Sequence, residues 1–546
     1  MGGDGPAPPT ASAVTAADGL ADLVRNALTA AGLPPADPTF ERPRQRAHGD
    51  WATNVALRLA KPVGRPPREI AQAIVDHLEL PADVAAAEVA GPGFVNFRLS
   101  HAALEEVVRS AVAAGHAWGR RPAEVPPRRV NVEFVSANPT GPLHVGHGRQ
   151  AALGDALAAL LEATGLAVTR EFYFNDAGGQ MRRFGESVAA AIRGEEPPED
   201  GYHGAYIAEL ARELVASGES EDVTEAAYAR MLERIKATLA ALGVRFDVYF
   251  GERTLHESGR IADAIERLRA AGHVYEGDGA TWLRTTTFGD DKDRVLVKAD
   301  GAMTYFAADC AYLVDKLERG FDQLVYVLGA DHHGYVARLQ AIAAAAGLEP
   351  GRVEVVLHQF VNLYRAGEVV RMSKRTGDII TFDELIEEVG GDAARYTFLR
   401  YSSDVTIDFD IAAVVRQDRE NPVYYVQYSH ARIAGIMRTA TARGVVPGDV
   451  ADAALDRLTH EAEVELVRRI GAYPETVAYA AEQRAPHRIA HYAEDLAEGF
   501  HRFYTQCQVV GDDPELTRAR YWLCVAARQT LVNALDLLGV SAPERM

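Results

Sequence analysis

Hydrophobic residues in the middle of the chain alternate between strand-like runs and stretches with helical spacing. RVNVEFVS is a continuous, β-branched run of the kind that forms a buried parallel strand. A Gly- and Pro-rich turn follows, and then GRQAALGDALAALLEATG, which has helical spacing and ends at Gly165. AVTREFYFND is again strand-like. This order of strand, turn, helix and strand predicts the βαβ unit of a dinucleotide-binding fold.

A second series of the same kind follows later in the chain. FDQLVYVLGAD is strand-like, YVARLQAIAAAAG is helical, and RVEVVLHQFVNL is strand-like again. The sheet is therefore expected to be split by an insertion over about 175–290. From about residue 410 the spacing is almost entirely helical, as in PVYYVQYSHARIAGIMRTATARG, which predicts a helical bundle.

The predicted fold class is α/β, with a Rossmann-like central domain, a small N-terminal α/β domain and an all-α C-terminal domain. A linker rich in Pro and Arg, GRRPAEVPPRR, marks the first change of pattern. The expected parts are a flexible tail of Gly, Pro and Ala at 1–17, the N-terminal domain at 18–118, the central domain at 119–410 and the helical domain at 411–546.

Composition narrows the class of protein. Of the 546 residues, 48% are hydrophobic and 25% charged, as in ordinary soluble proteins. No apolar run reaches the length of about 18 residues that a membrane span needs, and the N-terminus lacks the pattern of a secretory signal. The three cysteines, Cys310, Cys507 and Cys524, are too scattered for a disulfide framework or a zinc knuckle. We expect a cytoplasmic protein without bound zinc.

The net charge of −20 is unevenly distributed along the chain. The segment 195–225 holds ten acids and one arginine, whereas 41–68 holds seven bases and two acids. Binding of phosphates requires a local basic patch and not a positive total, so a nucleic-acid partner is not excluded. Charge alone is equally compatible with two solvated faces.

The turn NPTGPLHVGHGR carries the first candidate chemistry. His144 and His147 lie between the predicted strand and helix, three residues apart and so on one face of a helical turn. A helix N-terminus with a nearby glycine favours phosphate, to which both histidines can donate. A zinc site would need further ligands, and none lies nearby in the sequence. The alternative is that the two histidines only form hydrogen bonds within the turn and bind no ligand.

The segment EVVRMSKRTGD places Lys374 in a short polar loop after the last strand-like stretch. Met-Ser-Lys followed by Arg-Thr-Gly is too polar to pack in a hydrophobic core. Such a loop can close over a polyphosphate and neutralise the charge that develops as pyrophosphate leaves. Taken alone, a solvated charged turn is the more ordinary interpretation.

Together, His144-Val-Gly-His147 and Met372-Ser-Lys-Arg375 resemble the HIGH and KMSKS motifs of class I aminoacyl-tRNA synthetases. They occur in the right order, on opposite halves of the split fold. Longer stretches resemble the arginyl-tRNA synthetases along nearly the whole chain: VEFVSANPTGPLHVGH, DRVLVKADGAMTYFAADCAY, YVLGADHHGYVARL, NPVYYVQYSHAR and LLGVSAPERM.

The resemblance implies a two-step reaction. Arginine and ATP form arginyl-adenylate and pyrophosphate, and the arginyl group then moves to the 3′-terminal ribose of tRNA(Arg). It further implies that ATP enters with Mg²⁺ carried mainly by its phosphates. The residues it assigns to ATP are His144 and His147 on the phosphates, Gly146 beside the adenine, and Met372, Ser373 and Lys374 in the loop.

For L-arginine, the family pattern implies planar carboxylates in a fork around the guanidinium. It places these on Glu133 and Asp309, and the whole expected set is Glu133, Ser136, Asn138, Tyr305, Asp309, Asp331, His333 and Gln359. Tyr305 and Asp309 are four residues apart and so can face one pocket from a helix. Without the resemblance, a structural pair with a nearby arginine would be the preferred interpretation of Glu133.

For the tRNA, the resemblance implies contacts from both outer domains. The expected residues are Arg44, Trp51 and Asn54 in the N-terminal domain and Tyr424, Tyr428 and Arg432 in the helical domain. Unstacked bases favour aromatic faces and arginine planes. Tyrosines at helical spacing are as often part of a core. We expect a monomer with no membrane partner.

Three rival functions fit the sequence less well. Small nucleotidylyltransferases share the His-x-Gly-His turn, but they are far shorter and need no helical C-terminal domain. A cysteinyl or methionyl enzyme would usually bring a cysteine-rich zinc insert, which three scattered cysteines do not supply. If the chain were a tRNA-binding protein that had lost its activity, we would expect His144, His147 or Lys374 to be replaced. All three are present.

Overall fold

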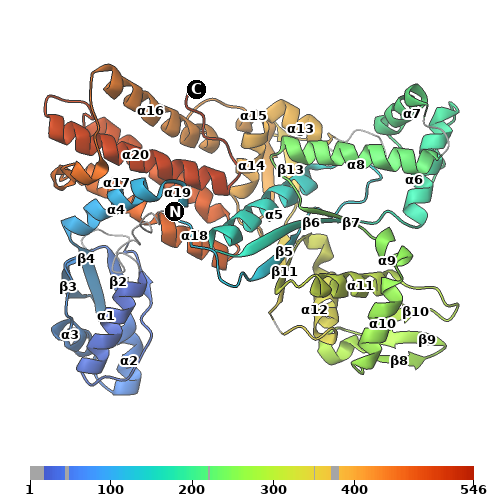
Figure 1. Ribbon diagram of the computed structural model, residues 1–546, viewed down its shortest axis with the longest axis horizontal. Coiled ribbons are helices and arrows are strands. Elements are labelled where there is room, and N and C mark those ends of the chain that lie inside the picture. Colours follow the sequence, from blue (N-terminus) through green and yellow to red (C-terminus); the bar gives the residue numbers. More distant parts are fainter. Residues whose placement is uncertain (1–16, 44–47, 219–221, 350, 371–379) are drawn as a thin grey trace, which may run out of the picture.

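The computed structural model describes residues 17–43, 48–218, 222–349, 351–370 and 380–546. Figure 1 shows an elongated molecule with a parallel sheet at its centre. The N-terminal domain and the C-terminal helices lie at one end, and the segments inserted into the sheet domain lie at the other.

The N-terminal domain is an antiparallel sheet covered by helices. Its four strands have the order β1-β2-β4-β3. A separate hydrophobic core unites Trp51 and Phe97 from the sheet with Val24, Val55 and Ile70 from the helices. The elements are α1 (Ala17–Ala30), β1 (Phe40–Glu41), β2 (Trp51–Thr53), α2 (Val55–Val63), α3 (Pro67–Asp76), β3 (Val84–Ala90) and β4 (Phe94–Leu99), and α4 (His101–Ala114) follows.

The central sheet is entirely parallel, with the order β12-β11-β5-β6-β7. Its strands are β5 (Arg129–Glu133), β6 (Ala167–Phe174), β7 (Val248–Gly251), β11 (Gln323–Gly329) and β12 (Val353–His358). The strand order reverses between β5 and β11, and ligands of such sheets bind outside the carboxyl ends of the strands at that point. The fold class is therefore the predicted one.

The insertion differs from the single segment expected at 175–290, because β7 lies inside that range and pairs in parallel with β6. The inserted chain is thus two pieces on either side of β7. The first holds α6 (Gly179–Ile192), α7 (Ala205–Ser217) and α8 (Val223–Ala241); the second holds α9 (Arg253–Glu257), α10 (Arg260–Ala270), β8 (Val274–Gly277), β9 (Ala280–Leu283) and β10 (Arg294–Val297). A four-residue edge strand is too short to show a period of its own.

The strand-like stretch RVEVVLHQFVNL also divides. Its first part is β12, and its second part, β13 (Val361–Arg365), leaves the central sheet to pair with β15 (Ile407–Asp410). Gln359 and Phe360 form the corner between them. The corner brings the end of β12 to the same edge as the ends of β5 and β11.

The C-terminal domain is a helical bundle and holds the N-terminal domain in place. Asp50, which is 5% exposed, forms a 2.5 Å ion pair with Arg468, and Arg42 pairs with Glu475 at 3.3 Å. The bundle consists of α16 (Pro422–Ala442), α17 (Glu461–Gly471), α18 (Tyr473–Glu482), α19 (His487–Gln506) and α20 (Pro514–Leu537).

Helix α5 (Val145–Ala163) lies between the central sheet and this bundle (Figure 1). It contacts β5, β6 and β11 on one side and α14 (Gly391–Leu399), α18 and α20 on the other. Small residues make this close packing possible: a Cβ at Gly154 would lie 2.2 Å from the Phe134 ring, and one at Gly148 would lie 2.2 Å from the Phe382 ring. A helix buried on all sides is expected to be mainly apolar, and beyond its first turn α5 has only Arg149, Gln150, Asp155 and Glu162 as polar residues.

We predict that Gly154→Ala destabilises the protein by about 1–3 kcal/mol, because the added methyl group overlaps the Phe134 ring inside a packed core. Thermal and urea denaturation would measure the loss. The matched control is Gly179→Ala in α6, where a Cβ meets nothing within 4 Å. Equal stability of the two variants would show that α5 can move away from the sheet.

Candidate functional site

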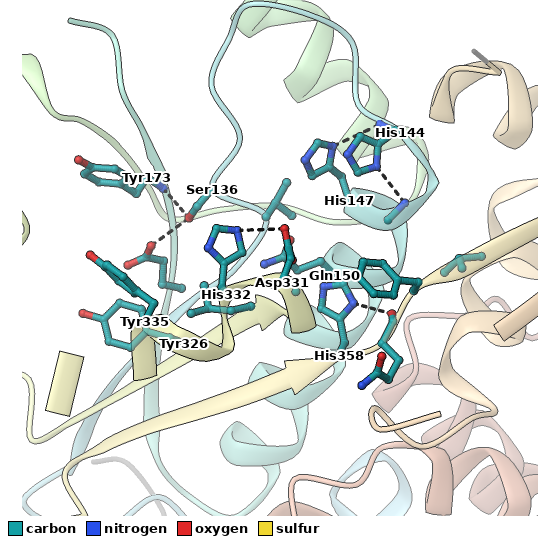
Figure 2. Close-up of a pocket in the computed structure, with 18 of the residues that line it drawn as sticks. Ser136, His144, His147, Gln150, Tyr173, Tyr326, Asp331, His332, Tyr335 and His358 are labelled. Atoms are coloured by element: carbon teal, nitrogen blue, oxygen red, sulfur yellow. Dashed lines mark hydrogen bonds and ion pairs between the residues drawn. The ribbon is translucent and has the colours of Figure 1, made fainter. Parts of the chain in front are cut away.

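A cavity of about 600 Å³ opens at the carboxyl ends of β5, β11 and β12 (Figure 2). Its wall has two chemically distinct halves. One half is rich in histidine and amide groups, including His144, Gly146, His147, Gln150, His358 and Gln359. The other is acidic and aromatic, including Glu133, Tyr173, Asp309, Tyr312, Tyr326 and Tyr335.

The histidine turn caps helix α5. The backbone N–H of Gly146 donates to Nδ1 of His144 at 3.1 Å, and the N–H of His144 donates to Nδ1 of His147 at 3.3 Å. The two rings stack with centroids 3.7 Å apart. Because each Nδ1 accepts a hydrogen bond, the neutral rings carry their hydrogen on Nε2, which makes Nε2 the donor. A Cβ on Gly146 would come within 3.0 Å of the His144 ring, so only glycine fits without displacing it.

The corner after β5 is strained. Val135 and Ser136 have φ angles of 69° and 42°, a region that residues with side chains rarely adopt and that is costly for a β-branched residue. Ser136 Oγ donates to Glu133 Oε1 at 3.0 Å and accepts the N–H of Tyr173 at 3.3 Å. Such strain persists where the surroundings over-determine it, which is common at binding sites.

Glu133 forms a buried ion pair at the floor of the cavity. It is 6% exposed, and its Oε2 lies 2.5 Å from Nζ of Lys316, which is fully buried. The ammonium group also lies 4.5 Å from the centre of the Tyr312 ring and 4.3 Å from that of Tyr326. The partner of this acid is thus a lysine of α11 (Tyr305–Glu318) and not the arginine considered as an alternative.

A second buried carboxylate lies behind the first. Glu171 accepts hydrogen bonds from Asn131 and Tyr312 and a forked pair of 2.7 and 2.8 Å from Arg319. Burial would raise the pKa of Glu171, but Lys316 and Arg319 outweigh burial and hold it below its usual value. This carboxylate is therefore ionised and fully compensated, and serves to fix the wall.

Asp309 is compensated less completely. Burial raises its pKa to about 7, and the neighbouring carboxylates Glu252 and Glu133 act in the same direction. A hydrogen bond from Tyr335 opposes the rise without cancelling it. The Tyr173 hydroxyl donates to Glu252 near the same place. Three carboxyl groups among tyrosine rings favour a cationic, planar group.

Three family models match the chain along most of its length. The arginyl tRNA synthetase N terminal domain matches residues 18–99, the catalytic domain of class I (R) tRNA synthetases matches 111–199 and 193–408, and the DALR anticodon binding domain matches 426–546. An arginine–tRNA ligase of Frankia alni is 51% identical over 530 residues, which are 94% of this chain and 95% of that protein. The chain belongs to the arginyl-tRNA synthetase family.

Solved structures agree with this assignment. The arginyl-tRNA synthetase of Thermus thermophilus has a TM-score of 0.78 and 26% identity, covering 96% of this chain and 99% of that one. A methionyl-tRNA synthetase of Mycobacterium tuberculosis has a TM-score of 0.52 and 16% identity over 77% of this chain and 92% of that one, and so shares the fold alone. The chain is thus a class I arginine–tRNA ligase.

The cavity of this synthetase gathers most of the residues expected from the sequence. Its wall includes His144, Gly146, His147, Glu133, Ser136, Asp309, Asp331 and Gln359. Three expected residues are not among those that line it. Asn138 instead joins the turn to α6, accepting from the Asn175 N–H at 3.0 Å and donating to Gln180 at 2.7 Å.

The other two lie close to the cavity. Tyr305 is 71% exposed at the start of α11, with its hydroxyl facing Gly178. His333 is exposed in the turn Ala330–Tyr335, and its neighbour His332 lines the cavity in its place. Met372, Ser373, Lys374 and Arg44 lie outside the described residues.

The tyrosines that line the cavity were not predicted from the sequence. Tyr173, Tyr312, Tyr326 and Tyr335 come from four different elements, and only the fold brings them together. A usable signal existed at Tyr173, which precedes Asn175-Asp176 at the end of a predicted strand, where ligands bind in such sheets. Lys316 carried no signal, because a lysine on a helix is usually solvated.

In the N-terminal domain, the structure does not support a direct tRNA contact by Trp51. Its side chain is 1% exposed, packs in the core and is covered by the Arg42 guanidinium, 4.2 Å from the ring centre. All three residues of β2 are buried, so both faces of this short strand are covered, and the sequence alone does not show that. Asn54, at the N-terminus of α2, is half-buried.

In the helical domain, the expected aromatic cluster is half-exposed. The Tyr424 and Tyr428 rings stack 6.1 Å apart on α16, and the Arg432 guanidinium lies 5.0 Å from the centres of both the Tyr428 and the Tyr504 rings. These ring and cation–π contacts join the four side chains across α16 and α19.

The described residues contain no group of three or more His, Cys, Asp or Glu side chains that could hold a metal ion. Within the same ranges, every helix is too short or too polar to cross a membrane.

Cys310, Cys507 and Cys524 are all free and buried, and burial raises the pKa of each thiol.

We predict that Lys316→Met destabilises this synthetase by about 3–5 kcal/mol, because it leaves the buried carboxylate of Glu133 uncompensated. Urea denaturation of the unliganded protein would measure it. The double variant Glu133→Gln/Lys316→Met should recover much of the loss, since both charges are then gone. If the double variant is as unstable as the sum of the single ones, the pair does not act as a unit.

Proposed function

We propose that this cavity activates L-arginine with ATP and then passes the arginyl group to tRNA(Arg), with the two halves of the wall holding the two small substrates. The observation that carries the proposal is that a histidine-capped helix N-terminus and a cluster of carboxylates adjoin at the strand-order reversal of one parallel sheet. The first suits phosphate and the second suits a guanidinium.

In the histidine half, the Nε2–H groups of His144 and His147 donate to the phosphates of ATP. Gly146 leaves room for the adenine. Lys374, with Ser373 and Met372 in the same loop, holds the β- and γ-phosphates as pyrophosphate leaves. Mg²⁺ enters on the ATP phosphates, where it screens their charge.

In the acidic half, Asp309 and Glu133 flank the guanidinium among the tyrosine rings. Ser136, Asp331 and, from the histidine half, Gln359 line the cavity where the amino-acid end would lie. Asn138 holds the turn against α6. Tyr305 and His333 contact the arginine from the opening of the cavity. Aligning the arginine carboxylate on the α-phosphate accelerates adenylate formation mainly through proximity.

The tRNA contacts both outer domains. Tyr424, Tyr428 and Arg432 supply stacking surfaces for anticodon bases, and Asn54 and Arg44 contact the tRNA from the N-terminal domain. The chain acts as a monomer in the cytoplasm.

The deciding experiment is pyrophosphate exchange into ATP with each amino acid, with and without total tRNA. Exchange that depends on arginine supports the proposal. Exchange with lysine or cysteine and none with arginine contradicts it. The arm without tRNA shows whether activation needs bound tRNA.

The loop lysine gives a sharper prediction. Lys374→Ala should lower the rate of adenylate formation by about 10²–10³-fold, because a charge that stabilises the leaving pyrophosphate is lost. The KM for arginine should change little, since the loop contacts the other substrate. Single-turnover kinetics measure the first effect. A variant with a normal rate would remove Lys374 from the mechanism.

Arginine binding should weaken in acid. The pKa of Asp309 is about 7, and a bound guanidinium would lower it, so binding releases a proton below about pH 7. The dissociation constant should therefore rise by up to tenfold per pH unit as the pH falls below about 7 and should be flat above it.

Calorimetry in two buffers of different ionisation enthalpy would count the released protons. Asp309→Asn is the control, because it binds arginine weakly and without this pH dependence. A wild-type dissociation constant that is constant between about pH 6 and pH 8 would exclude titration of Asp309 on binding.

A further inference from the structure

His358, the last residue of β12, has a fixed tautomer. The ring is 7% exposed, and its Nδ1 lies 3.1 Å from the Gln359 carbonyl oxygen (Figure 2). A carbonyl oxygen only accepts hydrogen bonds, so Nδ1 carries the hydrogen. Burial lowers the pKa of His358 to about 4, and the ring is neutral at physiological pH. Its Nε2 is therefore an acceptor.

This acceptor is unsatisfied. Nε2 is buried and has no hydrogen-bond partner anywhere in the ranges that the structure describes, although the residue lines the cavity. Buried polar atoms of native proteins are almost always paired, and the exceptions call for an explanation. A ligand that fills the cavity and brings a donor to this atom supplies one.

The ring is also held rigidly. The Gln359 carbonyl that fixes Nδ1 accepts a second hydrogen bond, of 2.8 Å, from Nη1 of Arg149. Arg149 is 1% exposed on α5, and its Nη2 donates to the Ser402 carbonyl at 2.9 Å. The helix that begins with the histidine turn thus fixes the direction in which His358 presents its lone pair.

The surroundings favour an uncharged donor. Burial, Arg149 and His332 disfavour a second positive charge here, and together they outweigh Asp331 and lower the pKa of His358. His358 also belongs to the histidine half, with β11 between its strand and the strand of Glu133. The arginine ammonium and guanidinium groups are thus poorer partners than the amino and hydroxyl groups of a nucleoside.

We propose that His358 reads the nucleoside of ATP, with its Nε2 accepting a hydrogen bond from the 6-amino group of adenine or from a ribose hydroxyl. The assignment rests on the proposed function, because it takes ATP to occupy the histidine half. If the donor is the 6-amino group, the same atom rejects guanine, whose 6-oxygen would place a second lone pair against Nε2.

Two substitutions separate the two nitrogen atoms of the ring. In His358→Asn the side-chain amide nitrogen can replace Nδ1 as donor to the Gln359 carbonyl, while the Nε2 acceptor is lost. In His358→Gln the longer side chain can return an acceptor oxygen to the position of Nε2. Both are compared with the wild type using ATP, 2′-deoxyATP, 3′-deoxyATP and purine riboside triphosphate, which lacks the 6-amino group.

The readout is the KM of each triphosphate in arginine-dependent pyrophosphate exchange, with tRNA present. In the wild type, the analogue that lacks the donor to His358 should have a KM about tenfold above that of ATP, because a buried acceptor is left unpaired. In His358→Asn, ATP and that analogue should have equal KM values. His358→Gln should restore part of the difference. The analogue that behaves in this way identifies the donor.

The proposal is overturned if His358→Asn leaves every ratio of analogue KM to ATP KM at its wild-type value. It is also overturned if the variant raises the KM for arginine alone. Melting temperatures check that the variants fold, and His358→Ala replaces an asparagine variant that does not. Absence of arginine-dependent exchange with ATP in the wild type would refute the proposed function itself, which is a different result.

Discussion

The burial of helix α5 on all sides is the constraint on which the rest of the molecule depends. The sheet packs against one side of it and the C-terminal bundle against the other, so the helix cannot tilt without opening the large core that the sheet and the bundle share. Its first turn carries the two histidines, and its buried Arg149 reaches the carbonyl groups at the ends of two further segments. The bundle is therefore part of the frame that positions the cavity, in addition to any role in binding RNA.

The electrostatics of the cavity follow from how completely each buried carboxylate is compensated. Glu171 has an arginine fork and a tyrosine hydroxyl, and Glu133 has a lysine and a serine hydroxyl. Asp309 faces the carboxylates Glu252 and Glu133, and its ionised form is stabilised mainly by the hydroxyl of Tyr335. Asp309 is thus the least compensated of these three carboxyl groups. A cationic group that binds beside it gains the most electrostatic stabilisation there.

The sequence was sufficient for the fold class, the family and the nucleotide motif, because these rest on long periodic segments and on motifs with fixed spacing. It was insufficient for β7, where four residues carry no period, and for the division of RVEVVLHQFVNL between two sheets. Near the cavity, residues at strand ends such as Glu133 and Asp331 were found, whereas Lys316 and the tyrosine wall depend on helix rotation and on tertiary packing. The same limit explains Trp51, whose burial depends on how the N-terminal sheet and helices pack and is not visible in the sequence.

The three buried thiols have a practical consequence. Cys310 belongs to the core around α11, and Cys507 and Cys524 belong to the large core shared by the central sheet and the bundle. A thiol reacts as its thiolate, so each is protected from alkylating reagents for as long as its core stays closed. The rate at which each one is alkylated would therefore report how often that core opens, with no foreign label attached. A cysteine introduced on the surface would in turn be the only thiol of the folded chain to take up a dye promptly.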